Sequence, residues 1–211
     1  MKALVTGGTR GIGLAMVRAL HRAGHKVVCV GKKEFNQLTI SNAVEYMGGL
    51  DILVNNAGLQ TSHSFADFPL SEFKEQMRVM VEMPFILSQQ AARYMKDGGH
   101  IVNVLSTAAF QGAKNIVGYI TAKHALLGLT RAMAVELAPD IHVNAIVPGL
   151  TETDMTKDMK PERRALLESI TPAGRFCKPE EIAEALMYLI NSTAIYGQTI
   201  TVDGGWMAKN G

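Results

Sequence analysis

The sequence has little cysteine, no long hydrophobic run and almost no net charge, and each of these shortages excludes a class of protein. Its 211 residues include two cysteines, Cys29 and Cys177, so we expect a reducing compartment rather than a disulfide framework. No apolar run approaches the roughly 20 residues of a membrane-spanning helix, and no signal peptide is evident ahead of the first strand. We therefore expect a cytoplasmic protein with no membrane association.

The balance of charged residues argues against a highly charged partner. The net charge is +2, from 21 basic and 19 acidic residues, which gives no reason to expect nucleic-acid binding. The six histidines are scattered along the chain, and we expect no metal site. A hydrophobic content of 47% is ordinary for a globular protein and is enough for a core at this length.

Short apolar runs alternate with helical patterns along the chain. The runs that predict strands are residues 2–6, 26–30, 51–54, 101–105, 142–147 and 199–202. The patterns that predict helices are residues 11–23, 71–95, 119–138 and 179–191. This alternation predicts an α/β fold, a single Rossmann-type doubly wound parallel sheet with helices on both faces, in one domain over residues 1–211.

The segment 31–50 is too short for the usual helix, strand and helix between two parallel strands. Each parallel crossover takes a dozen or more residues, and only one short helix near residues 41–47 fits. We therefore expect six strands, with one edge strand lost beyond the second strand.

A glycine-rich turn joins the first predicted strand to the first helix. Gly7, Gly11 and Gly13 allow a ligand to approach the backbone, and the helix start offers free N–H groups to a phosphate. This context favours a dinucleotide site over an ordinary strand-to-helix turn, which remains the alternative.

The residues after the second strand bear on the choice of cofactor. NAD sites usually place a carboxylate there, whereas this chain has Gly31 followed by Lys32 and Lys33. Lys32, together with Arg10 of the glycine turn, could attract a 2′-phosphate, which favours NADP. NAD stays open, because the lysines could be solvated loop charges and Glu34 could bind the ribose.

Tyr119 and Lys123 lie four residues apart in a predicted helix and share one face. A nearby ammonium favours the phenolate, so Lys123 is expected to lower the pKa of Tyr119 and make it a usable acid and base. Ser106 follows a predicted strand, at the edge where open α/β sheets bind ligands, and its hydroxyl can donate to a carbonyl oxygen. A Tyr–Lys pair alone would more often be two surface residues.

With these motifs the chain resembles the short-chain dehydrogenase/reductase family, in its classical branch. The likeness extends from the glycine turn to residues 202–205 and includes Asn55-Asn56-Ala57-Gly58, the Ser106–Tyr119 spacing and Pro148-Gly149. Within the family the chain is most similar to 3-oxoacyl-(acyl-carrier-protein) reductases and related ketoreductases. The resemblance implies an NADP(H)-dependent oxidoreductase that acts on a small carbonyl or alcohol substrate.

The resemblance also implies residue roles. Tyr119 would protonate the alkoxide, Lys123 would assist it and bind the nicotinamide ribose, and Ser106 would hold the substrate oxygen. The implied cofactor residues are Gly7, Thr9, Arg10, Gly11, Ile12, Gly13, Lys32, Asn55, Ala57, Gly58, Tyr119, Lys123, Pro148, Gly149, Thr151 and Thr153. Residues 151–172 would form a substrate lid, and the helices near residues 71–95 and 119–138 would pair in a homodimer or homotetramer.

Two departures from the family pattern stand out. Met80 occupies the position of an active-site asparagine that supports a proton relay, and methionine has no proton to donate. The shortened segment 31–50 leaves Gln37 as the nearest match to an acidic residue that contacts adenine. These departures keep a second hypothesis open, in which the chain is a weak or inactive dinucleotide-binding sensor or partner subunit.

Overall fold

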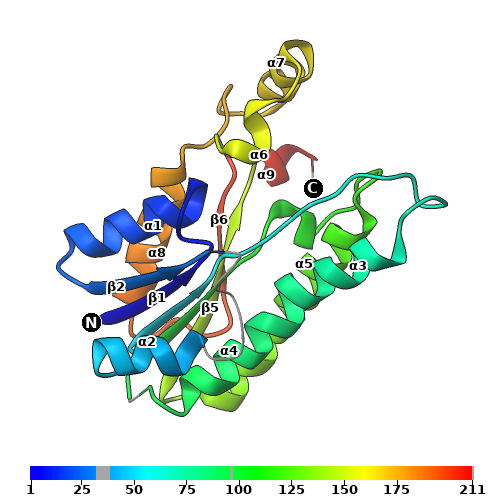
Figure 1. Cartoon of the computed structure of the whole chain (residues 1–211). Helices are drawn as coiled ribbons and strands as arrows, with labels where there is room; N and C mark the ends of the chain where they lie inside the picture. Colours follow the sequence, from blue (N-terminus) through cyan, green and yellow to red (C-terminus); the bar gives the residue numbers. More distant parts are fainter. Residues whose placement is uncertain (32–38, 96, 211) are drawn as a thin grey trace.

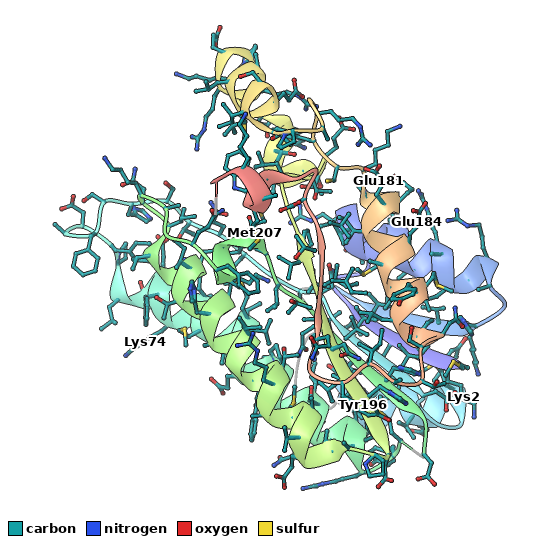
Figure 2. The ribbon with its side chains drawn as sticks, turned by 180° about the vertical axis from the view of Figure 1, so that it is seen from behind. Lys2, Lys74, Glu181, Glu184, Tyr196 and Met207 are labelled. Carbon is teal, nitrogen blue, oxygen red and sulfur yellow. The ribbon has the colours of Figure 1, made fainter. Side chains whose placement is uncertain are left out.

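The computed structural model describes residues 1–31, 39–95 and 97–210. Its centre is one sheet of six strands, and every neighbouring pair is parallel, in the order β2-β1-β3-β4-β5-β6 (Figure 1). The strands are β1 (Lys2–Thr6), β2 (Lys26–Val30), β3 (Ile52–Asn55), β4 (Gly99–Val104), β5 (Ile141–Pro148) and β6 (Thr199–Val202). The six-stranded α/β fold predicted from the sequence is confirmed.

The order of the strands fixes where a ligand can bind. From β1 the chain moves first to β2 on one side and then to β3 on the other. The connections therefore leave in opposite directions at the carboxyl ends of β1 and β3, which is where open α/β sheets form a ligand crevice. Every residue of β3, β4 and β5 is buried, because helices cover both faces of these central strands.

Two groups of helices cover the sheet. On one face α1 (Gly11–Arg22) and α8 (Pro179–Ile190) pack over apolar side chains of β1, β3 and β4. On the other face lie α2 (Thr39–Met47), α4 (Met83–Ala92) and α5 (Val117–Leu137). Figure 1 shows the two groups on opposite sides of the strands. No helix of the described residues is long and apolar enough to cross a membrane.

The helix predicted over residues 71–95 is present over residues 70–92, with a change of helical type in its middle. The segment divides into α3 (Leu70–Met77), a π-helical turn η1 (Arg78–Glu82) and α4. Pro84 has no N–H and cannot donate to the carbonyl of Met80, so regular α-helical bonding is interrupted there. The N–H of Met83 instead donates to the carbonyl of Arg78, five residues earlier. This wider turn contains Met80.

The short helix expected near residues 41–47 is α2, and β2 is an edge strand of the sheet. Residues 32–38, which include the rest of the shortened segment with Lys32, Lys33, Glu34 and Gln37, lie outside the described residues.

The segment 151–172, for which the sequence predicts no particular secondary structure, forms two helices. They are α6 (Asp154–Lys157) and α7 (Pro161–Ile170), and α7 buries none of its residues. Figure 1 shows α7 projecting beyond the carboxyl ends of the strands, with α6 between it and the sheet. The short helices η2 (Thr107–Ala109) and α9 (Trp206–Asn210) lie at the same end of the sheet.

Candidate active site at the carboxyl edge of the sheet

The structure brings the three predicted catalytic residues together. Ser106 follows β4, and its side chain is hydrogen-bonded to that of Tyr119 on α5. Ser106 also caps η2, because its Oγ accepts a hydrogen bond from the backbone N–H of Ala108 at 3.2 Å. Lys123 lies one helical turn after Tyr119, with its Nζ 5.5 Å from the centroid of the tyrosine ring. The strand end and the helix thus position the trio.

Lys123 is a buried cation, and among the described residues no carboxylate is paired with it. Its side chain is only 4% exposed, and its Nζ donates to the carbonyl oxygen of Val104 at 2.7 Å. Burial disfavours the ammonium form and lowers the pKa of Lys123 to about 8. This pKa places the change between ammonium and amine close to neutral pH.

Two opposing effects act on the pKa of Tyr119 in this structure. Burial penalises the phenolate and raises the pKa of Tyr119, while the hydrogen bond with Ser106 lowers it by less. Lys123 donates one of its three ammonium protons to the backbone of β4, and the phenol has its hydrogen bond with Ser106. Tyr119 is therefore a protonated phenol in this structure, ready to donate its proton.

Met80 packs directly into the site. It is fully buried in a small apolar cluster with Val79 and Ala122, against which Tyr119 also packs. Its sulfur lies 3.6 Å from the position that a Cβ at Gly58 would occupy. The thioether therefore fills space beside Tyr119 with a group that cannot donate a proton. Glu82 is exposed, so it does not replace the missing polar side chain.

The glycine turn packs tightly against the loop after β3. A Cβ added at Gly13 would lie 2.3 Å from the carbonyl oxygen of Gly7 and 2.4 Å from Nδ2 of Asn56. Asn56 donates from Nδ2 to the carbonyls of Thr6 and Gly7 at 2.9 and 3.2 Å, and Thr6 Oγ1 accepts from the N–H groups of Asn56 and Ala57. Only a residue without a side chain fits at Gly13, so α1 can begin in close contact with the glycine turn and with Asn56.

Sequence reasoning missed Thr6 and Asn56, which shape this turn. A hydroxyl at the last position of β1 and an amide directly after β3 were the available signals, since both strands end at the same edge of the sheet.

The side chain of Asn55 is buried in a hydrogen-bonded polar cluster behind the site. It is 3% exposed, and its Nδ2 donates to Ser88 Oγ at 3.1 Å and to Asn103 Oδ1 at 2.9 Å. Asn103 in turn donates to Thr130 at 2.8 Å. The side chain of Asn55 thus ties β3 to β4 and α4 within the core. Ile12 likewise packs against the core on the α1 face rather than standing free in the crevice.

The strand end at Pro148-Gly149 packs against the residue that follows β6. A Cβ at Gly149 would lie 2.6 Å from the Cα of Asp203. The carboxylate of Asp203 accepts from the N–H groups of Gly205 and Met207, both at 2.8 Å, and so holds the turn into α9. Asp203 was not among the predicted site residues, although it lies in the motif at residues 202–205. Thr151 is buried beyond Gly149, whose carbonyl accepts from its Oγ1 at 3.0 Å.

Thr153 and Arg10 connect the segment 151–172 to the glycine turn. Thr153 caps α6, and its Cγ2 lies 3.3 Å from the position of a Cβ at Gly11. Arg10 forms an ion pair with Asp154, with 3.4 Å between Nη1 and Oδ2. Thr9 and Gly58 are exposed nearby, and Ala57 is half-buried. Every described residue of the predicted set therefore lies at or just behind one edge of the sheet.

Comparison with known proteins agrees with this geometry. A family model described as enoyl-(acyl carrier protein) reductase matches residues 30–207, and one described as short chain dehydrogenase matches residues 1–38. A 3-oxoacyl-[acyl-carrier-protein] reductase of Aquifex aeolicus is 36% identical over 236 aligned positions, covering 96% of this chain and 95% of that protein.

Two further relatives carry different names. A 3alpha-hydroxysteroid dehydrogenase of Mediterraneibacter gnavus is also 36% identical, over 96% of this chain and 95% of that protein. A solved structure of a candidate 2-deoxy-D-gluconate 3-dehydrogenase from Agrobacterium tumefaciens, with bound NADP, has a TM-score of 0.86 at 32% identity, covering 98% of this chain and 96% of that one.

Proposed function

The chain belongs to the short-chain dehydrogenase/reductase family, and we propose that it is an NADP(H)-dependent ketoreductase with Tyr119 as its proton donor. Its relatives are named as oxidoreductases that act on carbonyl and hydroxyl groups. The observation that carries the proposal is the meeting of a protonated Tyr119, its hydrogen-bonded Ser106 and the buried Lys123 at the carboxyl edge of the sheet. An acid beside a hydroxyl donor is the arrangement that carbonyl reduction requires.

The chain's own residues supply the acid half of the reaction. A bound nicotinamide supplies the hydride to the carbonyl carbon. Ser106 Oγ donates to the carbonyl oxygen and holds it beside Tyr119, whose phenol gives its proton to that oxygen. The Lys123 ammonium offsets the negative charge left on the tyrosine. The same residues run in reverse would oxidise an alcohol.

The residues around the glycine turn fit a dinucleotide, because the turn leads into the start of α1, where the first backbone N–H groups can bind a phosphate. We propose that the remaining predicted residues bind the dinucleotide, and that residues of the lid, 151–172, take part in this binding. These are Thr9, Gly11, Ala57, Gly58, Pro148, Thr151 and Thr153, with Ile12 contributing its backbone.

NADP is the proposed cofactor, on the basis of Arg10 and Lys32. The end of β2 adjoins the glycine turn, since the N–H of Gly7 donates to the carbonyl of Val30 at 2.8 Å. Arg10 follows in that turn, within reach of the ribose position at the end of β2. Charge-assisted bonds to phosphate contribute about 1.5–3 kcal/mol each. Lys32→Asp should therefore narrow or invert a preference for NADPH over NADH in fluorescence titrations, and tighter binding of NADH by the wild type would refute the assignment.

Activity is tested by NADPH oxidation with ketones of the classes that the relatives' names suggest. The panel holds an acetoacetyl thioester, a 3-oxosteroid and a keto sugar acid. We expect turnover on one class, and Tyr119→Phe should lower it by about 10² or more while cofactor binding persists. Tyr188→Phe is the matched control, because Tyr188 is 60% exposed on α8.

The second candidate function is a dinucleotide-binding sensor without catalysis, which the buried Met80 favours. Binding of NADPH without turnover on any member of the panel would support this candidate over the enzyme.

A homodimer or homotetramer in the cytoplasm is the proposed assembly. The outer face of α3, η1 and α5 carries an apolar groove lined by Phe73, Met77, Val81, Phe85 and Leu129, and Phe85 is 48% exposed. Burying such a face against a second copy would remove apolar surface from water. Light scattering after gel filtration should give a dimer or tetramer, and Phe85→Glu should shift it toward monomer.

A further inference from the structure

The ion pair between Arg10 and Asp154 joins the two parts of the site that a cofactor would lie between. Arg10 is the N-cap residue of α1 and has no hydrogen bond to its own helix from its side chain. Asp154 is the first residue of α6, at the base of the lid segment 151–172. Their side chains are 76% and 47% exposed, so water and ions reach the pair freely.

The same guanidinium is the group proposed to bind the 2′-phosphate. That phosphate would sit near the end of β2, where Gly7 hydrogen-bonds to Val30, whereas Asp154 approaches Arg10 from the lid. A single exposed arginine side chain therefore has two anionic partners available from different elements.

Asp154 can release Arg10 without being left unpaired. Lys157 lies one turn later in α6, with its Nζ 3.7 Å from the other carboxylate oxygen, Oδ1. The base of the lid also stays packed against the glycine turn, because Thr153 contacts Gly11. When Arg10 moves from the carboxylate to a phosphate, Asp154 therefore keeps a cationic partner in Lys157, and Arg10 keeps an anionic partner.

We propose that Asp154 is a determinant of cofactor preference, which competes with the 2′-phosphate of NADP(H) for Arg10 and so links the lid to the identity of the cofactor. This inference rests on the proposed NADP assignment. NADPH must displace the carboxylate to engage Arg10, whereas NADH leaves the ion pair in place. The acidic residue on the lid therefore reduces the preference for NADPH that Arg10 would otherwise give.

The expected effect is small and specific. An exposed ion pair contributes about 0.2–1 kcal/mol, which corresponds to a change in Kd of about 1.4- to 5-fold. Asp154→Asn should tighten NADPH binding by that factor in fluorescence titration at low salt, and should leave the Kd for NADH unchanged. Asp158→Asn is the matched control, because it removes the same charge from an exposed lid position.

The test is a double-mutant cycle with Arg10→Met. In the Arg10→Met background, Asp154→Asn should no longer change NADPH binding. Without cofactor, each single variant should increase hydrogen exchange in the peptide covering residues 151–170 to the same degree, and the double variant should add nothing further.

The outcomes separate the two proposals. If Arg10→Met weakens NADPH binding but Asp154→Asn leaves it unchanged, the NADP assignment stands and the competition is refuted. An equal gain in NADPH affinity from Asp158→Asn would also refute the competition, because the gain would then come from removing a negative charge anywhere on the lid. If Arg10→Met leaves the ratio of NADPH to NADH affinity unchanged, Arg10 does not read the phosphate, and both the competition and the role of Arg10 in cofactor choice fail.

Discussion

Lys123 of α5 is hydrogen-bonded to the end of β4: its Nζ donates to the carbonyl oxygen of Val104 at 2.7 Å. Ser106 follows two residues after Val104, so one strand end positions both the hydroxyl and the ammonium of the site. Among the described residues no carboxylate stabilises the ammonium form of Lys123, and burial lowers its pKa to about 8.

This pKa predicts the alkaline limit of carbonyl reduction. Below about pH 8 Lys123 is an ammonium that offsets charge on Tyr119, and above it the charge is lost, while the raised pKa of Tyr119 keeps the phenol protonated. The value of kcat/KM should therefore fall about tenfold per pH unit on the alkaline side. Lys123→Arg keeps its charge at any accessible pH, so any activity it retains should lack this limb. An alkaline limb that is unchanged in Lys123→Arg would exclude Lys123 as its source.

The close approach at Gly13 predicts a large effect from one methyl group. Gly13→Ala would place a Cβ within 2.4 Å of both Gly7 and Asn56, and overpacking of this kind costs about 1–3 kcal/mol. We expect a lower free energy of unfolding in urea and loss of NADPH binding. Gly128→Ala is the control, since it lies in α5 with nothing within 4 Å of its Cβ position and should gain up to about 1 kcal/mol. Equal stability of the two variants would contradict the proposed fit.

The sequence predicted most of this fold because its signals were local. Buried strands such as residues 141–148 are continuous apolar runs, and the glycine turn has its meaning through the strand before it and the helix after it. The roles of Asn55 and Asn56 could not be separated in this way. Adjacent residues at a strand end point to opposite sides, and only the packed neighbours show that Asn55 enters the core while Asn56 holds the turn.

The π-helical turn at η1 was also beyond sequence periodicity. Pro84 signals an interruption, but whether a helix kinks, stops or widens depends on what its faces contact. Here Met80 faces Ala122 and Tyr119 of α5, and the helix continues past the interruption as α4.

A buried histidine at the opposite end of the sheet predicts loss of stability in acid. His100 is 5% exposed, stacks on His142 with 4.8 Å between ring centroids, and has a pKa lowered to about 4 by burial and by His142. Because its folded pKa lies below the ordinary 6.5, its contribution is present above pH 6.5 and is lost as the pH falls toward 4, by on the order of 3 kcal/mol.

His100→Phe keeps a stacking ring and removes the titration. The fall in the free energy of unfolding between pH 7.5 and pH 5, measured in urea, should therefore be smaller in His100→Phe than in the wild type. His124→Gln, at an exposed position of α5, should behave as the wild type does. The same pH dependence in all three proteins would place the acid sensitivity elsewhere.

Met80 predicts that proton delivery to the site is slow rather than absent. Its thioether cannot donate a proton, and Glu82 is exposed and does not take its place. The carbonyl of Met80 lacks its α-helical donor, because that donor would be Pro84, and we expect this carbonyl to accept a hydrogen bond from water. A relay through the backbone and water can then resupply Tyr119 without a side chain. Met80→Asn should add an amide beside this carbonyl and raise kcat severalfold, with little change in cofactor affinity. Met80→Leu separates chemistry from packing, because it keeps the apolar volume and should leave kcat unchanged. Thermal unfolding is measured to check that Met80→Asn is folded, since a buried amide without hydrogen-bond partners lowers the free energy of unfolding by about 1–3 kcal/mol. Unchanged or lower kcat in folded Met80→Asn would show that the enzyme uses another proton route, for which the amide is no improvement.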